Sequence, residues 1–193
     1  AAARASDLLL LIEDASPARR REAAHGLMQA GDAAATPALL ARLAREEEVA
    51  VREAIFTALA GIGGEAVAEG MVALLRSEDA GLRNGAVEVL QLLPEPTAAR
   101  IEAMLADADA DVRILALNVV GSLPRAEAPG WLCRVLALDP DPRVCGTAVD
   151  ALAEAGGPEA VEPLRQVARR FPDDPYLAFA AELAIRRILG GAG

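Results

Sequence analysis

The stretch "DADADVRILALNVVGSLP", from Asp107 to Pro124, decides the fold. Three aspartates alternate with alanines, a Val-Arg pair follows, and the rest is almost purely aliphatic. Apolar residues recur at i, i+3, i+4 and i+7, the pattern of one face of an α-helix. They are Val112, Leu115, Ala116 and Val119. Taken alone, the acids could form a metal or catalytic site, or they could mark a repeated turn.

The same pattern recurs along the chain. The aliphatic-Arg pair, or its equivalent, begins at residues 19, 51, 82, 112 and 144, so consecutive starts are 32, 31, 30 and 32 residues apart. Each helical stretch ends at glycine or proline and is followed by a second amphipathic stretch, such as "TPALLARLARE". One helix pair cannot bury both apolar faces, whereas stacked pairs share a continuous core. The sequence therefore predicts an all-α fold, a right-handed α-solenoid of about five to six antiparallel helix pairs.

The spacing also predicts how the chain is organised. We expect a single repeat domain over residues 1–193. The two ends are predicted to be half-repeats or caps, at 1–13 and 172–193. The sequence does not begin with Met, and two alternatives stay open: the end pieces are caps, or the chain is a domain excised from a longer solenoid. The full repeats are predicted at 14–46, 47–77, 78–107, 108–139 and 140–171.

The composition narrows the class of protein. Hydrophobic residues make up 53% of the chain and aromatic residues only 3%, which favours a core of close-packed Ala, Leu, Val and Ile helices. All 19 basic residues are arginine, and the net charge of −10 argues against binding nucleic acid or anionic membranes. No stretch reaches the roughly 18 consecutive apolar residues of a membrane span. We expect a bacterial, cytoplasmic protein.

The repeated unit resembles HEAT repeats, in particular the short HEAT-like repeats of phycobilisome lyases. The Asp-rich turn, the Val-Arg pair, the following Ala and the closing Gly carry the resemblance, for example in "DADADVRILALNVVG". The resemblance implies that turn acids and the repeated arginine cap helices and pair between repeats. The fifth repeat has Cys145 in place of the arginine, with Arg143 two residues earlier, so the ladder is expected to be broken or rerouted there. The implied ladder residues are Arg20, Arg52, Arg83, Arg113, Asp14, Asp107 and Asp139.

Sites of chemistry are hard to find in this sequence. A calcium-binding EF-hand loop starting at Asp107 would need Gly at its sixth position and Glu at its twelfth, but Val112 and Asn118 stand there. The acids are therefore interpreted as a helix start, which the helix dipole favours. The single histidine, His25, has no partner that would suggest a metal or a general base. We predict no catalytic residue, no metal and no cofactor, and we predict that the chain is not an enzyme.

Three other residues leave alternatives open. Cys133 and Cys145 are interpreted as small packing residues, with a reactive or bilin-carrying thiol as the alternative. Trp131, the only tryptophan, fits the apolar face of its helix and could instead anchor a partner.

The second helices are expected to line a concave face, where outward arginines could bind an acidic segment. The favoured function is a scaffold that binds a partner protein, or another domain of the parent chain, on this face. The alternative is a bilin lyase-like protein that handles a chromophore, and nucleic-acid binding is a weaker third hypothesis. The candidate partner-binding residues are Arg42, Arg45, Arg76, Arg100, Glu102, Trp131, Arg134, Arg165 and Arg169.

Overall fold

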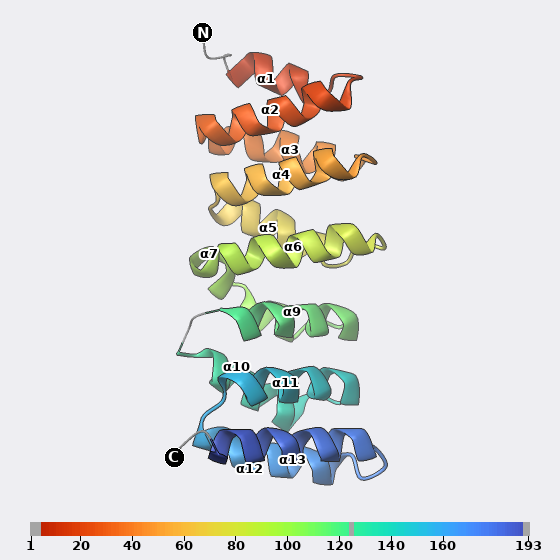
Figure 1. Cartoon of the computed structure of the whole chain (residues 1–193), viewed down its shortest axis with the longest axis vertical. Helices are drawn as coiled ribbons and strands as arrows, with labels where there is room; N and C mark the ends of the chain where they lie inside the picture. The colour runs from red at the N-terminus through yellow and green to blue at the C-terminus, as the bar shows by residue number, and fades with distance from the viewer. Residues whose placement is uncertain (1–4, 124–125, 191–193) are drawn as a thin grey trace. The chain divides into compact units, whose positions relative to one another are not determined.

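The structure is a computed structural model that describes residues 5–123 and 126–190. Every regular element in these two ranges is helical, and the predicted all-α solenoid class is confirmed (Figure 1). Contacts group the chain into two units, 1–97 and 98–193, each described by itself. The outer ends of the predicted half-repeats, 1–4 and 191–193, lie outside the described residues, as does Pro124. The single-domain arrangement and the right-handed twist stay predictions.

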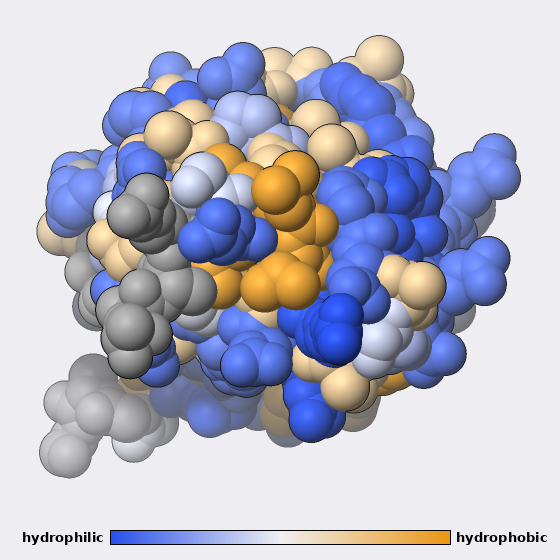
Figure 2. Space-filling model, turned by 90° about the horizontal axis from the view of Figure 1, so that it is seen from above, coloured by the Kyte–Doolittle hydropathy of each residue, from blue (hydrophilic) through white to orange (hydrophobic). Residues whose placement is uncertain are grey.

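In the N-terminal unit, the long helices α2, α4 and α6 pack on one another in succession, and α3 and α5 pack beside them (Figure 1). A short helix, α1, covers α2 at the N-terminal end. Seen from that end, the surface shows a hydrophobic patch bordered by hydrophilic residues (Figure 2), and Leu10 of α1 is 75% exposed. The elements are α1 (Ala5–Leu11), α2 (Pro17–Ala30), η1 (Ala33–Ala35), α3 (Thr36–Leu43), α4 (Val49–Ile62), α5 (Glu65–Leu74), α6 (Ala80–Leu92) and α7 (Pro94–Ala98).

The C-terminal unit is built in the same way. The long helices α9, α11 and α13 pack in succession, with α10 against α11 and α12 against α13. The elements are α8 (Ile101–Leu105), α9 (Ala110–Ser122), α10 (Ala128–Leu138), α11 (Pro142–Ala155), η2 (Pro158–Ala160), α12 (Val161–Arg170) and α13 (Pro175–Gly190). None of the helices within the described ranges has the length and apolar character needed to cross a bilayer.

The alternating acids of the opening stretch form successive turns that lead into α9. The carboxylate of Asp107 accepts a hydrogen bond from the backbone N–H of Asp109 at 2.9 Å. Asp109 accepts in the same way from Asp111, also at 2.9 Å, and caps the helix. Asp79 and Asp141 cap α6 and α11 with equivalent bonds. Because these oxygens accept backbone N–H groups that a helix start leaves unpaired, the acids act as helix caps.

The buried face of α9 is wider than the predicted stripe. Val112, Ala116 and Val119 are buried as expected, but Leu115 is only half-buried. Leu117 and Val120 are fully buried instead. The reason is that α9 packs against three helices, α8, α10 and α11. These contacts bury a wider part of its surface than a single stripe.

The two units share one register in sequence. Helices α2 and α9 begin at residues 17 and 110, and α4 and α11 run from 49 to 62 and from 142 to 155. The start of α5 at residue 65 corresponds to that of η2 at residue 158. Each pair is 93 residues apart, which spans three repeats. Residues of the two units can therefore be compared position by position.

Candidate functional site

The ladder arginines, defined as Arg20, Arg52, Arg83 and Arg113, hold the turns between repeats. Each donates from its guanidinium to the backbone carbonyl six residues before it. Three of them also donate to the carbonyl five residues before. This constant offset explains the repeated arginine of the sequence, because the side chain fixes the turn that precedes its own helix. The acceptor carbonyls are those of Asp14, Glu46, Ser77 and Asp107.

Three ladder arginines also bind an acid in the next turn. Arg20 pairs with Glu46, Arg52 with Asp79 and Arg113 with Asp139, and the shortest N–O distance is 2.7 Å in each. Asp139 was implied by the resemblance, whereas Glu46 and Asp79 were missed. The carboxylates of Asp14 and Asp107 have a different role, because they accept backbone N–H groups within their own turns.

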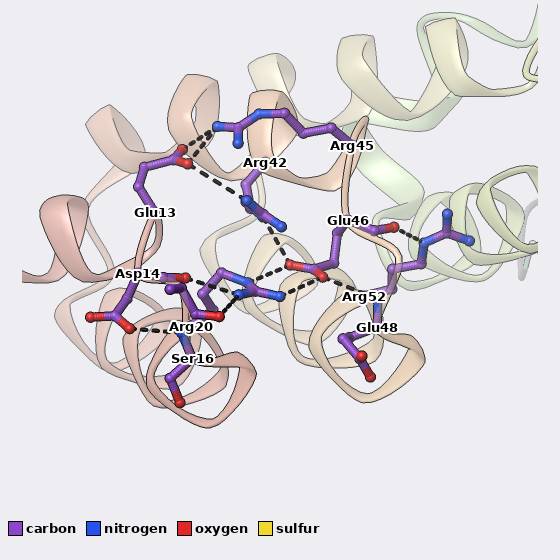
Figure 3. A network of polar contacts seen from close by, with 10 residues as sticks. Glu13, Asp14, Ser16, Arg20, Arg42, Arg45, Glu46, Glu48 and Arg52 are labelled. Atoms are coloured by element: carbon purple, nitrogen blue, oxygen red, sulfur yellow. Dashed lines mark hydrogen bonds and ion pairs between the residues drawn. The ribbon is translucent and has the colours of Figure 1, made fainter.

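The turn at Glu46 is filled by a network of charged side chains (Figure 3). The Glu46 carboxylate is almost fully buried and accepts hydrogen bonds from Arg20 and Arg42 at 2.7 to 2.8 Å. Glu13 pairs with both Arg42 and Arg45 on the outer side of the network. Burial alone would raise the pKa of Glu46, but the bonds from Arg20 and Arg42 outweigh it and lower the pKa to about 2. Arg42 and Arg45, predicted to bind a partner, are thus tied to carboxylates of their own unit.

The corresponding turn of the C-terminal unit is hollow. A pocket of about 550 Å³ opens at the turn that Arg113 and Asp139 hold together. It lies between α8 and α10, the two second helices of neighbouring repeats. The lining residues are Glu102, Leu105, Ala106, Asp107, Arg113, Trp131, Arg134, Val135, Leu138, Asp139 and Pro140.

The pocket combines a buried ion pair, an aromatic ring and an exposed rim. Arg113 and Asp139 form a two-pronged pair at 2.7 and 3.1 Å, and their side chains are 11% and 6% exposed. The hydrogen bond with Asp139 raises the pKa of Arg113, which therefore stays charged. Trp131 is half-buried in the lining. Arg134 and Glu102 pair across the rim at 3.2 Å, with both side chains well exposed.

The shared register shows why one turn is filled and the other hollow. At the offset of 93 residues, Arg113 and Asp139 correspond to Arg20 and Glu46, so the ladder pair itself is retained. The charged residues that fill the first turn are replaced by apolar ones. Glu13, Arg42 and Arg45 correspond to Ala106, Val135 and Leu138, and Ala38 corresponds to Trp131. The pocket is therefore lined by apolar side chains and one indole ring at the positions where the filled turn carries three charged side chains and an alanine.

At Cys145, an arginine from elsewhere in the chain takes the place of the ladder arginine. Of the two alternatives, a broken or a rerouted ladder, the structure shows the second. The buried Cys145 thiol lies 3.5 Å from the Asp139 carbonyl, which is the acceptor a ladder arginine would use. Arg170, at the end of α12, donates to that carbonyl at 2.8 Å and also to the carbonyl of Leu136. Arg143 takes no part, because it pairs with Asp111 and Asp141. Arg170 thus supports the turn next to the pocket, and no spacing pattern predicted it.

The remaining predicted partner-binding residues are spread over both units. Arg76 follows α5, and Arg100 precedes α8. Arg165 and Arg169 lie exposed on α12, where Arg165 is 3.8 Å from Glu162. Of the nine predicted residues, the structure brings Glu102, Trp131 and Arg134 together at one pocket.

Neither cysteine is poised as a nucleophile. Burial, with a contribution from Glu159, raises the pKa of Cys133. Burial raises the pKa of Cys145 to about 11. Both thiols are therefore protonated at neutral pH, and a thiol is a poor nucleophile compared with a thiolate. His25 lies exposed on α2. Within the described ranges, no three His, Cys, Asp or Glu side chains are grouped closely enough to hold a metal ion.

A fold of stacked helix pairs with a ladder of arginines and acids defines a helical-repeat protein. The family model for HEAT repeats matches residues 5–91 and 97–186, so this chain belongs to the HEAT repeat family. The resemblance drawn from the sequence is confirmed.

Comparison with known proteins gives one curated relative and several solved structures. The relative is the bilin biosynthesis protein PecE of Mastigocladus laminosus, 40% identical over 74 residues, which cover 38% of this chain and 28% of the relative. The chain thus spans less than a third of this relative. Among solved structures, human deoxyhypusine hydroxylase has a TM-score of 0.47 at 19% identity, covering 96% of this chain and 84% of that one. The CpcE–CpcF complex of phycocyanin lyase from Nostoc sp. has a TM-score of 0.43 at 16% identity, covering 96% and 95%.

The similarity to a bilin biosynthesis protein contradicts the prediction that the chain is not an enzyme. That prediction rested on the lack of a calcium-binding loop at Asp107 and on the lack of a metal or general-base partner for His25. A site that holds a large organic molecule needs only a pocket with an aromatic ring and a few placed charges, and such a site leaves no short motif in a sequence.

Proposed function

We propose that this chain takes part in attaching a linear tetrapyrrole to an acceptor protein or in removing it. The tetrapyrrole would occupy the pocket between α8 and α10. The similarity to a bilin biosynthesis protein, at 40% identity over 74 residues, carries the proposal. The pocket supports it because it supplies a place of suitable size and chemistry.

The size of the pocket suits such a molecule. Its volume of about 550 Å³ falls within the range of roughly 300–1,000 Å³ that is typical of small-molecule sites. The indole of Trp131 offers a flat surface on which a conjugated ring can stack. Val135 and Leu138 add aliphatic contacts on the same helix. A planar, largely apolar ligand would therefore be held mainly by α10.

The polar groups of the pocket match the polar groups of a linear tetrapyrrole. Such a molecule carries pyrrole N–H donors and two propionate carboxylates. Glu102 and Asp107 have carboxylates at the lining that can accept N–H groups. Arg134, whose side chain is 60% exposed, can turn from Glu102 to a propionate at little cost, because an exposed ion pair is worth about 0–1 kcal/mol. Arg113 stays committed to Asp139 and shapes the floor of the pocket.

The state of the cysteines indicates how the tetrapyrrole would be held. Both thiols are protonated, and neither cysteine lines the pocket. The chain would therefore bind the tetrapyrrole without a covalent bond and pass it to, or accept it from, a thiol on another protein. A transient carrier needs reversible binding of this kind.

The single tryptophan provides a direct test. We expect biliverdin, a linear tetrapyrrole, to quench Trp131 fluorescence and to shift its own visible absorption when titrated into the chain. Trp131→Ala should weaken binding about 10-fold or more, because it removes the aromatic ring on which the ligand stacks, whereas Trp131→Phe should retain most of the binding.

Arg165→Glu provides a matched control, because Arg165 is an exposed arginine of α12 outside the pocket. It should leave the absorption shift unchanged, while Arg134→Glu should reduce the shift. An unaltered biliverdin spectrum at saturating native chain would remove the tetrapyrrole proposal. An equal response to Arg134→Glu and Arg165→Glu would remove the pocket assignment.

A protein partner is part of the same proposal, because the tetrapyrrole must come from or go to an acceptor. The exposed arginines Arg165 and Arg169 of α12 support docking of an acidic acceptor surface. We expect Arg165→Glu combined with Arg169→Glu to lower capture of a bilin-bearing acceptor in a pull-down. Biliverdin binding by this double variant should stay normal, which separates docking from ligand binding.

A further inference from the structure

The last helix, α13, has an exposed hydrophobic stripe. Tyr176, Phe179 and Leu183 are 69%, 64% and 57% exposed. Their spacing of three and four residues places them on one side of the helix. The opposite side is occupied by Leu177, Ala181, Ala184 and Ile188, which are buried in the C-terminal unit.

The stripe is not required by the repeat. Aligned on the first buried position of each helix, Leu177 of α13 corresponds to Val144 of α11 and Val112 of α9. The stripe positions of α11 are Arg143, Gly146 and Asp150, and those of α9 are Asp111, Ile114 and Asn118. Polar residues predominate on the sister helices, so the aromatic and aliphatic side chains of α13 are a local feature. A cluster of exposed apolar residues on one surface is typical of a contact site.

The stripe is complementary to itself when two copies are antiparallel. It continues to Arg186, ten residues after Tyr176, so that its order is aromatic, aromatic, aliphatic, cationic. In an antiparallel pair of α13 helices, Tyr176 of one copy faces Arg186 of the other, and Phe179 faces Leu183. Both pairs are centred on position 181, so a single two-fold axis satisfies them together. The first pair would be a cation–π contact, for which the Arg186 guanidinium would turn from its exposed ion pair with Glu182, and the second would be an apolar contact.

We propose that two copies of this chain associate through α13, antiparallel, about a two-fold axis at position 181. Covering Tyr176, Phe179 and Leu183 removes on the order of 400 Å² per copy. This is about half of the roughly 800 Å² per partner in a standard stable interface. The dimer therefore dissociates on dilution, and its population depends on protein concentration. The proposal is independent of the tetrapyrrole pocket, because no stripe residue lines that pocket.

Sedimentation velocity over a concentration series tests the dimer. We expect the native chain to pass from monomer to dimer and to stop there, because a two-fold interface is closed. Phe179→Lys and Leu183→Glu should each weaken the dimer at least 10-fold. Leu10→Glu, at a leucine of α1 that is even more exposed than Leu183, is the matched control and should leave it intact.

Mixing the two variants tests the antiparallel register. In a mixed dimer, Lys at position 179 of one copy faces Glu at position 183 of the other, while the second Phe179–Leu183 contact is native. An equimolar mixture should therefore recover association that neither variant has alone. Circular dichroism should show unchanged helicity for both. Three results would overturn the proposal: a native chain that stays monomeric, a mixture that fails to recover, or open-ended association that Leu10→Glu abolishes.

Discussion

The turns at Glu46 and Asp139 occupy equivalent positions three repeats apart in the chain, yet they have opposite contents. Both are bridged by a ladder arginine, Arg20 in the first and Arg113 in the second. The first is filled by three further charged side chains, and the second encloses a pocket of about 550 Å³. The ladder pair therefore maintains the stack, while the residues around it are free to change.

This difference indicates how a HEAT repeat can acquire a site. The ladder pair fixes the distance between successive turns, so the neighbouring positions can lose their charges without collapse of the stack. In the C-terminal unit, these positions carry Ala106, Val135 and Leu138, and Trp131 replaces an alanine. Under the proposed function, the residues that stabilise the stack and the residues that bind the ligand therefore lie only a few positions apart. Four substitution experiments test this separation.

The largest effect is expected at the filled turn. Glu46→Ala leaves the buried guanidinium of Arg20 without its carboxylate, and removal of one partner of a buried ion pair costs about 3–5 kcal/mol. Urea unfolding followed by circular dichroism measures the loss, and hydrogen exchange should locate it to α2, α3 and α4. Glu47→Ala, at the exposed neighbour, should change stability by no more than about 0.5 kcal/mol. Equal effects of the two variants would show that the charged network around Glu46 contributes nothing to the free energy of unfolding.

Acid should weaken the filled turn in a defined pH range. The pKa of Glu46 falls from its ordinary value of 4.5 to about 2 in the folded chain. A carboxyl whose pKa is lower in the folded chain than in the unfolded chain stabilises the fold at pH values above its unfolded pKa. The contribution of Glu46 to the free energy of unfolding is therefore complete above about pH 4.5 and is lost as pH falls towards 2. Its size is on the order of 3 kcal/mol. The free energy of unfolding of the native chain should fall more steeply over this range than that of Glu46→Gln, and parallel curves would contradict the role of Glu46.

The sequence predicted the repeated architecture because each position of the repeat occurs several times in the chain. The apolar stripes, the turn acids and the ladder arginines each recur at about 31 residues, so that chance matches are averaged out. The backbone carbonyls that the ladder arginines bind also recur with the same spacing. The pocket could not be predicted in this way, because it depends on residues that differ from their counterparts in other repeats. A departure such as Leu138 in place of Arg45 is recognised only when the register of the two units is known.

The arginine that replaces the ladder position at Cys145 could not be predicted from the sequence either. The sequence indicated that the fifth position lacks its arginine, and it suggested Arg143 as a nearby replacement. The observed replacement, Arg170, comes from α12, the second helix of the same repeat as Cys145, 31 residues after the carbonyl of Asp139 that it binds. Such contacts depend on how α12 packs against α10, and no local pattern encodes this packing.

Refilling the hollow turn is expected to have an intermediate effect. The variant Ala106→Glu/Val135→Arg/Leu138→Arg gives the second turn the charged residues of the first. Biliverdin binding should fall about 100-fold, equivalent to about 2.7 kcal/mol, because side chains would occupy the pocket. The free energy of unfolding should change by less, since the new charges can pair as Glu13, Arg42 and Arg45 do. Ala137→Arg, an exposed position of α10 outside the lining, is the control and should bind normally. Undiminished binding by the triple variant would place the ligand elsewhere.

The smallest effect is expected at the rerouted ladder. Arg170→Ala removes hydrogen bonds to the carbonyls of Leu136 and Asp139 and should cost about 1–2 kcal/mol. Cys145→Arg alone should also destabilise, because Arg170 already occupies the acceptor beside the buried thiol. The double variant should recover most of the loss, since an arginine at position 145 can donate to the Asp139 carbonyl as Arg52 does to that of Glu46. Urea unfolding of all four chains measures this coupling. If the double variant is as unstable as the sum of the single variants, then Arg170 does not replace the missing ladder arginine, and the turn beside the pocket is held by packing alone.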